Sequence, residues 1–165
     1  MELLVVRHAI ACERDASRWT DDSRRPLSAA GERRFRRAVA GLAKVTQRPV
    51  RVFCSPYVRA VQTADVLAEV AGWPAPRTCD ELIPGASTDA VLRVLRGCQV
   101  RRLAIVGHEP DLGELIVACL ARGADFAFPM KKGAVACLNF AKRPSRGGAS
   151  LKWYLPPKML RRVGT

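Results

Sequence analysis

The sequence predicts an α/β protein, a three-layer α/β/α sandwich whose central sheet is mostly parallel and has an antiparallel edge strand. The first observation is a series of short, continuous apolar runs, which are typical of strands covered on both faces. The second is that helical patterns alternate with these runs along the chain. No linker, repeat or low-complexity segment interrupts the alternation, and 165 residues suffice to bury a core, so we expect one domain over residues 1–165.

The N-terminal part of the chain predicts a strand, a loop and a helix. Residues 2–6 are apolar and predict the first strand, and the polar residues 9–27 predict a long functional loop. Ser28 is the expected N-cap of a helix that has an apolar stripe at helical spacing. The stripe consists of Phe35, Ala38, Val39 and Leu42. The arginines at positions 33, 34, 36 and 37 fall mostly on the other side, which we interpret as a solvated helix face.

A serine and a proline stand between the next predicted strand and helix. Residues 50–54 predict the strand, and Ser55 followed by Pro56 is typical of an N-cap with proline in the first helical position. The helix is expected to end near Gly72. Arg59 then lies in or just after the first helical turn, where it can face the ends of the strands.

The second half of the chain continues the alternation and ends in a hairpin. In order, we expect a short extended piece near 77–82, a helix around 87–96, a strand over 102–106 and a helix over 112–121. The last two runs, 134–140 and 151–155, predict antiparallel strands joined by the loop 143–148.

The composition is that of a soluble globular protein. Hydrophobic residues make up 48% of the chain and the mean hydropathy is -0.03, while no apolar run approaches the ~20 residues of a membrane span. Met1-Glu2 leads into a strand without a basic leader, so we expect no signal peptide, no membrane contact and a cytoplasmic location. The six cysteines are widely spaced without a C-x-x-C pair, which favours buried reduced thiols over disulfides or a metal site. We therefore expect no metal and no cofactor.

The chain is strongly basic, with a formal net charge of +13. Such a charge attracts anionic partners and raises nonspecific affinity for nucleic acid or for acidic protein surfaces. No acidic residue follows Asp125, whereas nine lysines and arginines do. We favour a solvated basic face as the explanation, because the chain has no recognised nucleic-acid motif and no aromatic residues interleaved with the basic ones.

The two histidines, His8 and His108, each follow a predicted strand after one intervening residue, Arg7 or Gly107. Arg7 precedes His8, and Arg59 follows the strand 50–54. Ligands bind beyond the carboxyl ends of parallel strands, so these four side chains predict one cationic pocket. Arginine matches phosphoryl oxygens with its planar fork, and two guanidinium groups lower the pKa of an imidazole beside them. The sequence therefore predicts a phosphate site in which an unprotonated histidine can form a covalent phospho-intermediate.

Four motifs carry a more specific indication. They are Val5-Val6-Arg7-His8-Ala9, Arg25-Pro26-Leu27-Ser28-x-x-Gly31, Cys54-Ser55-Pro56-Tyr57-x-Arg59-Ala60-x-Gln62-Thr63-Ala64 and Val106-Gly107-His108-Glu109-Pro110. Together they resemble the histidine phosphatase superfamily, which has the phosphoglycerate mutase-like fold, and most of all its small SixA-type phosphohistidine phosphatase branch. The matches run in order to about residue 115, and residues 133–136 fit a later strand of the family. The arginine–histidine doublet alone is unspecific, whereas the third motif is highly specific.

The resemblance implies a role for each matched residue. His8 would accept the phosphoryl group, Arg7 and Arg59 would hold its oxygens, and His108 would donate a further hydrogen bond. Arg25 matches a family arginine near the mouth of the pocket. Ser55 is expected to cap its helix rather than to touch substrate.

Two positions depart from the family pattern. Ala9 stands where glycine is frequent, which leaves the site plausible. Glu81 is the candidate general acid, although the residues around it match the family acid motif poorly, and an ion pair with a nearby arginine is an equally good interpretation. A phosphohistidine needs no strong acid because its leaving group is good. The short segment 81–102 also leaves no room for a cap domain.

These observations favour a metal-independent phosphatase that hydrolyses phosphohistidine on a partner protein. The alternative is a small-molecule phosphomonoesterase of the same fold that uses Glu81 as its acid. A basic nucleic-acid-binding module without catalysis is a third hypothesis, supported only by the net charge of +13.

Overall fold

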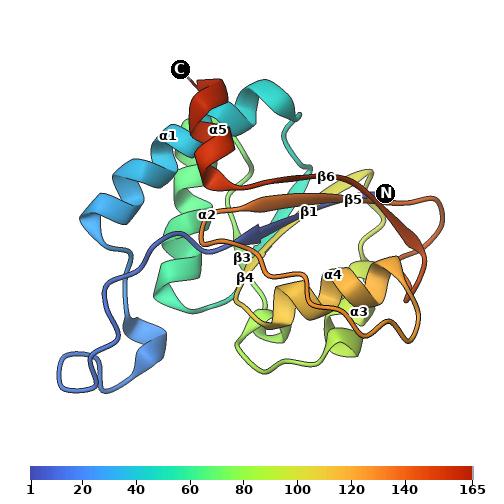
Figure 1. The fold of residues 1–165 in the computed structure, drawn as a ribbon, viewed down its shortest axis with the longest axis horizontal. Coiled ribbons are helices and arrows are strands. Elements are labelled where there is room, and N and C mark those ends of the chain that lie inside the picture. Colours follow the sequence, from blue (N-terminus) through green and yellow to red (C-terminus); the bar gives the residue numbers. More distant parts are fainter. Residues whose placement is uncertain (165) are drawn as a thin grey trace.

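The computed structural model describes residues 1–164, which form a six-stranded sheet between two layers of helices (Figure 1). The strands are β1 (Glu2–Arg7), β2 (Arg51–Cys54), β3 (Arg77–Thr78), β4 (Arg102–Gly107), β5 (Val135–Phe140) and β6 (Ala149–Leu155). The α-helices are α1 (Ala29–Val45), α2 (Val58–Ala71), α3 (Thr88–Gly97), α4 (Asp111–Leu120) and α5 (Pro157–Gly164), and two 3-10 turns are η1 (Asp22–Arg24) and η2 (Asp80–Leu82). The predicted three-layer α/β class is confirmed.

The sheet has the strand order β3-β2-β4-β1-β5-β6. The pairs β3–β2, β2–β4 and β4–β1 are parallel, whereas β5 is antiparallel to both β1 and β6. The prediction of a mostly parallel sheet is therefore correct, and the reversed strand β5 lies one place in from the edge. After β5 the predicted hairpin reverses the chain again, so that β6 pairs with the outer side of β5 and becomes the edge strand.

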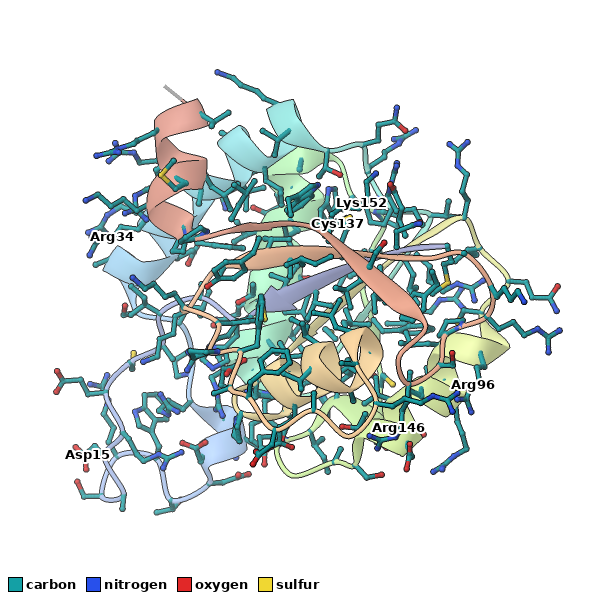
Figure 2. The ribbon with its side chains drawn as sticks, turned by 45° about the vertical axis from the view of Figure 1, so that its right-hand side comes forward. Asp15, Arg34, Arg96, Cys137, Arg146 and Lys152 are labelled. Carbon is teal, nitrogen blue, oxygen red and sulfur yellow. The ribbon has the colours of Figure 1, made fainter. Side chains whose placement is uncertain are left out.

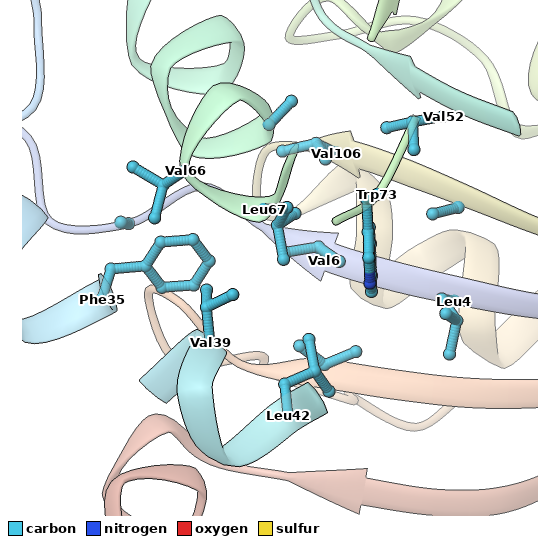
Figure 3. Close-up of a cluster of buried hydrophobic side chains, with 14 of the residues drawn as sticks. Leu4, Val6, Phe35, Val39, Leu42, Val52, Val66, Leu67, Trp73 and Val106 are labelled. Carbon is cyan, nitrogen blue, oxygen red and sulfur yellow. The ribbon is translucent and has the colours of Figure 1, made fainter. Parts of the chain in front are cut away.

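Each face of the sheet is covered by its own hydrophobic core. Leu4 and Val6 of β1 point to the face that packs against α1, α2 and α5, part of which is shown in Figure 3. Leu3 and Val5 point to the face that packs against α3 and α4. Successive side chains of a strand alternate between faces, so a strand covered on both sides must be apolar throughout. This explains the continuous apolar runs. Five of the six cysteines are buried and Cys12 is partly exposed, which confirms the predicted burial of most of them.

The structure adds one helix that was not predicted and corrects two local predictions. The short helix α5 was not expected, because only Leu160 among its eight residues is buried and the segment is otherwise largely polar. The extended piece near 77–82 is a strand only over Arg77–Thr78 and then forms η2. Helix α2 begins at Val58 with Tyr57 in the N-cap position, so Ser55 does not cap it.

The carboxyl ends of three neighbouring parallel strands lie together at one end of the sheet. Val6 of β1 is paired with Val106 of β4, which is paired with Cys54 of β2. The chain therefore reaches His8, His108 and Ser55 from neighbouring strands that end at the same level. Within residues 1–164, none of the helices combines the length and the apolar character that crossing a bilayer requires.

Candidate active site

A cavity of about 820 Å³ lies beyond the carboxyl ends of β1, β4 and β2. Five of the residues predicted from the sequence line it together, although they come from four separate parts of the chain. They are Arg7, His8, Arg25, Arg59 and His108.

His8 lies in the cavity wall with 6% of its surface exposed. Its Nδ1 is 2.7 Å from the carbonyl oxygen of Ala9. Because a carbonyl oxygen only accepts hydrogen bonds, Nδ1 carries the ring proton and Nε2 retains its lone pair. Burial lowers the pKa of His8 to about 3, and the charges of Arg59 and Arg7 act in the same direction. The ring is therefore a neutral base at physiological pH.

His108 lies beside His8, with the ring centroids 5.1 Å apart. Burial and then the neighbouring His8 and Arg59 lower the pKa of His108 to about 3. Its Nε2 is 2.9 Å from Ser55 Oγ, which also accepts a hydrogen bond from the backbone N–H of Tyr57. Ser55 therefore contacts a residue of the site instead of capping a helix, which corrects the expectation from the sequence.

The two arginines are held by different parts of the protein. Arg59 has 3% of its surface exposed and donates from Nη1 to the carbonyl of Asp22, at 2.7 Å, and from Nη2 to the carboxylate of Asp22, at 3.0 Å. Arg7 donates from Nη1 to the carbonyl of Met130. Within residues 1–164, Nε of Arg7, Nε of Arg59 and Nδ1 of His108 are buried without a hydrogen-bond partner. Glu109 Oε1 is buried and unpaired in the same way. Buried polar atoms without a partner are unusual when they lie at one place, and they mark a site where a ligand can supply the missing partners.

Arg25 is buried and joins the loop to this site. It donates from Nε to the carboxylate of Asp22, at 2.8 Å, and from Nη1 to the carbonyl of Cys12, at 2.8 Å. The hydrogen bond from Arg25 and the charge of Arg59 hold the pKa of Asp22 below its ordinary value. Asp22 is consequently an ionised carboxylate that positions two arginines.

The third sequence motif supplies the connections behind the site. Thr63 Oγ1 donates to the carbonyl of Arg59, at 2.6 Å, and accepts from the backbone N–H of Ala9, at 3.0 Å. Gln62 Oε1 accepts from the backbone N–H of Leu27, at 2.7 Å. One turn of α2 thus holds the loop that follows His8 and the loop that follows Arg25. The sequence showed these polar residues as part of a motif, but nothing in it showed what they bind.

The structure does not bring Glu81 to the cavity: this residue is absent from the lining within the described part of the chain. Its carboxylate accepts a hydrogen bond from Cys79 Sγ, at 3.2 Å. Five charged residues without a predicted role also line the cavity: Glu13, Arg14, Asp22, Glu109 and Lys132. Burial raises the pKa of Glu109, and the charge of Arg7 partly opposes this shift. Burial lowers the pKa of Lys132, and the charge of Arg7 lowers it further. Glu109 directly follows His108, and Lys132 precedes the strand beside β1, so both could have been suspected from their places next to predicted strand ends.

The comparison with known families shows to which family the chain belongs. The model of the histidine phosphatase superfamily (branch 1) matches residues 3–83, which include Arg7, His8 and Arg59. The chain belongs to the histidine phosphatase superfamily. The resemblance noted from the sequence motifs is thereby confirmed.

One relative and two solved structures are similar to this chain over most of its length. An uncharacterized protein of Picosynechococcus sp. is 36% identical over 142 residues, which cover 84% of this chain and 85% of that protein. The protein histidine phosphatase SixA, solved in complex with tungstate, matches with a TM-score of 0.83 and 25% identity over 96% of this chain and 98% of that one. A mycobacterial glucosyl-3-phosphoglycerate phosphatase in complex with VO3 matches with a TM-score of 0.65 and 17% identity over 94% and 99% of the two chains. Membership of the superfamily and the SixA-type fold support phosphatase activity.

Proposed function

We propose that this phosphatase hydrolyses phosphohistidine on a partner protein and forms a covalent phosphohistidine on His8. The observation that carries the proposal is the state of the His8 ring, whose Nε2 is unprotonated because Nδ1 donates to Ala9. This nucleophile lies among cationic and neutral donors, including the unpaired N–H groups of Arg7 and Arg59.

The reaction proceeds in two displacements at phosphorus. The substrate ring first takes a proton from solvent on its free ring nitrogen. The lone pair of His8 Nε2 then attacks phosphorus, the P–N bond of the substrate breaks, and the substrate ring leaves with the electron pair as neutral imidazole. Water then attacks the phosphoryl group on His8, the new P–N bond breaks, and inorganic phosphate and a neutral His8 are regenerated while the proton of water is lost to solvent. Arg7 and Arg59 stabilise charge on the equatorial oxygens in both transition states.

His108 supplies a further donor in this proposal. Its low pKa keeps the ring neutral, so one ring nitrogen carries a proton and the other does not. Ser55 Oγ accepts from Tyr57 and is free to donate its own hydrogen to Nε2 of His108. The ring proton is then on Nδ1, which has no partner within residues 1–164 and can bind a phosphoryl oxygen.

The leaving group favours phosphohistidine over an alkyl phosphate. An alkoxide must be protonated as it leaves, whereas an imidazole is a much weaker base. Asp22 has no proton to give near neutral pH because Arg25 and Arg59 hold it ionised, and Glu81 does not line the cavity, which leaves Glu13 and Glu109 as the other carboxyls of the lining. Hydrolysis of a phosphohistidine requires neither of them as an acid. The segment 81–102 forms η2 and α3, and α3 packs against the sheet, so it builds no domain over the cavity. An open cavity suits a side chain displayed on another protein.

The test is phosphate release from a histidine-phosphorylated carrier protein in EDTA, by the parent protein and by its His8→Ala variant. Release by the parent, loss of release in the variant, and acid-labile phosphate trapped on the parent alone are the expected results. Equal release by both proteins would refute the role of His8. No release by either would refute the proposed substrate.

A phosphomonoesterase activity is the second candidate, and the observation that favours it is Glu109. This carboxyl lines the cavity and its pKa is raised, so it is the better proton donor for an alkoxide than Glu81. Turnover of an alkyl phosphate that decreases at least ~100-fold in Glu109→Gln, and is unchanged in Glu81→Gln, would establish this activity. If neither variant affects alkyl phosphate turnover, neither Glu109 nor Glu81 is the acid that this candidate requires.

A further inference from the structure

A second, smaller hollow adjoins the active-site cavity. Its volume is about 140 Å³, and it shares Ile10 and Lys132 with the larger cavity. Phe35 of α1 and Pro157 of α5 contribute apolar surface to its wall. It lies where α1 and α5 pack against each other, next to the loop that leads into β5.

The charges around this hollow are all positive. Arg34 of α1, Arg161 of α5 and Lys132 line it, and we call the three together with the hollow the basic groove. Its lining within the described residues contains no carboxylate, and none of the three cations forms an ion pair with residues 1–164. Arg36, also on α1, differs because it pairs with Glu69. Figure 2 shows Arg34 on the side of the molecule where α5 lies.

The like charges of the basic groove remain close together without compensation. Partial burial and the charges of Arg34 and Arg37 lower the pKa of Arg161. The pKa of Lys132 is lowered by burial and by the arginines of the active site. A bound anion would relieve this repulsion, and the exposed side chains of Arg34 and Lys132 are accessible to it.

The size of the basic groove indicates what kind of anion it takes. Pockets for small molecules typically have volumes of ~300–1,000 Å³, well above the 140 Å³ found here. A single side chain of a bound protein fits this space better. An aspartate or glutamate matches it chemically, because its methylene groups can contact Phe35 and Pro157 while its carboxylate meets the cations.

We propose that the basic groove binds an acidic side chain of the partner protein while the phosphohistidine of that partner occupies the active-site cavity. The inference rests on the proposed function and adds a specificity element to it: the substrate is a phosphohistidine with aspartate or glutamate close to it on the protein surface. Lys132 borders both sites, so the two groups of the partner are bound side by side. Charges at the edge of an interface chiefly raise the association rate and select the partner.

The test uses two synthetic phosphohistidine peptides that differ only in having aspartates or asparagines beside the phosphohistidine. The proteins are the parent, Arg34→Glu/Arg161→Glu (the groove variant) and the control Lys142→Glu/Arg143→Glu. The control makes the same change of charge in the β5–β6 loop, at the end of the strands opposite to the active-site cavity. We expect the parent to prefer the acidic peptide about tenfold in kcat/KM, through KM. The groove variant should lose the preference and the control should keep it. Arg34→Gln/Arg161→Gln, together with thermal unfolding, separates lost binding from lost folding.

A binding measurement tests the basic groove independently of phosphatase activity. Fluorescence anisotropy of the labelled acidic peptide without its phosphoryl group should show binding that the groove variants abolish and the control retains. If neither phosphopeptide is hydrolysed, the proposed function fails while this binding result still supports the groove. Equal turnover and binding of acidic and neutral peptides by the parent would overturn the groove. A competition experiment can also overturn the proposal. If a single-stranded oligonucleotide displaces the labelled acidic peptide at a lower concentration than the unlabelled peptide does, the groove is a nucleic-acid site.

Discussion

At His8, a single hydrogen bond determines which ring nitrogen can react. The carbonyl of Ala9 fixes the proton on Nδ1, and burial beside arginines keeps the ring from gaining a second proton. Thr63 binds the backbone N–H of the same Ala9, so the loop that carries the acceptor is itself held in place. The reactivity of one side chain therefore depends on backbone groups next to it and on a threonine far along the chain.

The depressed pKa values of the two histidines predict how stability depends on pH. Each has a pKa of about 3 in the folded protein against an ordinary 6.5, so below pH 6.5 the unfolded chain binds protons that the folded chain does not. The free energy of unfolding should therefore fall as the pH decreases from 6.5 toward 3, by up to about 1.4 kcal/mol per pH unit for each histidine. Above pH 6.5 both states are neutral and this dependence disappears.

Urea unfolding at pH 7.5, 6 and 5 of the parent and of His108→Gln measures this slope. The variant should lose about half of it. Comparing the two proteins removes the contribution of Glu109, whose raised pKa acts in the opposite direction. An unchanged slope in the variant, or a ring NMR signal of His8 that titrates near pH 6.5, would show that the histidines are not buried as neutral bases.

Thr63→Val should damage both stability and activity. The substitution keeps the shape of the side chain and leaves the N–H of Ala9 without its acceptor in the core, at a cost of about 1–3 kcal/mol. Because Ala9 and Arg59 are both released, kcat/KM should fall about tenfold. Thr78→Val, at an exposed position of β3, is the control and should change neither quantity. Full activity in Thr63→Val would mean that the cavity is held by other contacts.

At the scale of elements, helix α5 depends on its contact with α1. Leu160 is the buried residue of α5, and its carbonyl lies over Gly41 of α1 so closely that a Cβ at Gly41 would be 1.8 Å from that oxygen. A short helix with one buried residue has little stability of its own, so α5 is stabilised by its packing against α1.

Gly41→Ala should therefore displace α5. We expect the substitution to lower the free energy of unfolding by about 1–3 kcal/mol, because the extra methyl group overpacks the contact. Gly97→Ala is the matched control in another helix, where a Cβ meets nothing within 4 Å and the melting temperature should stay the same or rise slightly. Equal melting temperatures of the two variants would show that the α1–α5 contact is not close. Since α5 supplies Arg161, Gly41→Ala should also weaken binding of the acidic peptide.

For the whole molecule, the net charge of +13 and its distribution matter for encounter with a partner. Raising the salt concentration from about 0.05 to about 0.5 M should lower kcat/KM several-fold for an acidic phosphohistidine protein, because attraction over distances beyond a few ångströms is screened. Free phosphohistidine, which meets only the active-site cavity, should lose less. The ratio of the two values across a salt series is the measurement, and a constant ratio would mean that the charge does not select partners.

Much of the fold could be predicted from the sequence because its signals are local. Continuous apolar runs mark strands that are covered on both faces, and Ser28 and Gly72 mark helix ends through their own backbone and side-chain preferences. Helix α5 lacked such a signal since its reason for being helical lies in α1. Ser55 was misjudged for a related reason: a serine before a proline resembles a cap, but its partner His108 is 53 residues away.

The sequence by itself determined the class of the protein, the family, and the positions of Arg7, His8, Arg59 and His108 at strand ends. These conclusions depend only on the types of residues and on their order along the chain, and a short sequence motif specifies both. Only the tertiary structure decided that Glu81 lies outside the cavity lining, that Glu109 and Lys132 belong to it, and that Arg34 and Arg161 lie together in the basic groove. The physical reason is that these relations depend on how separate elements pack, and packing sets distances between residues that the order of the chain leaves free.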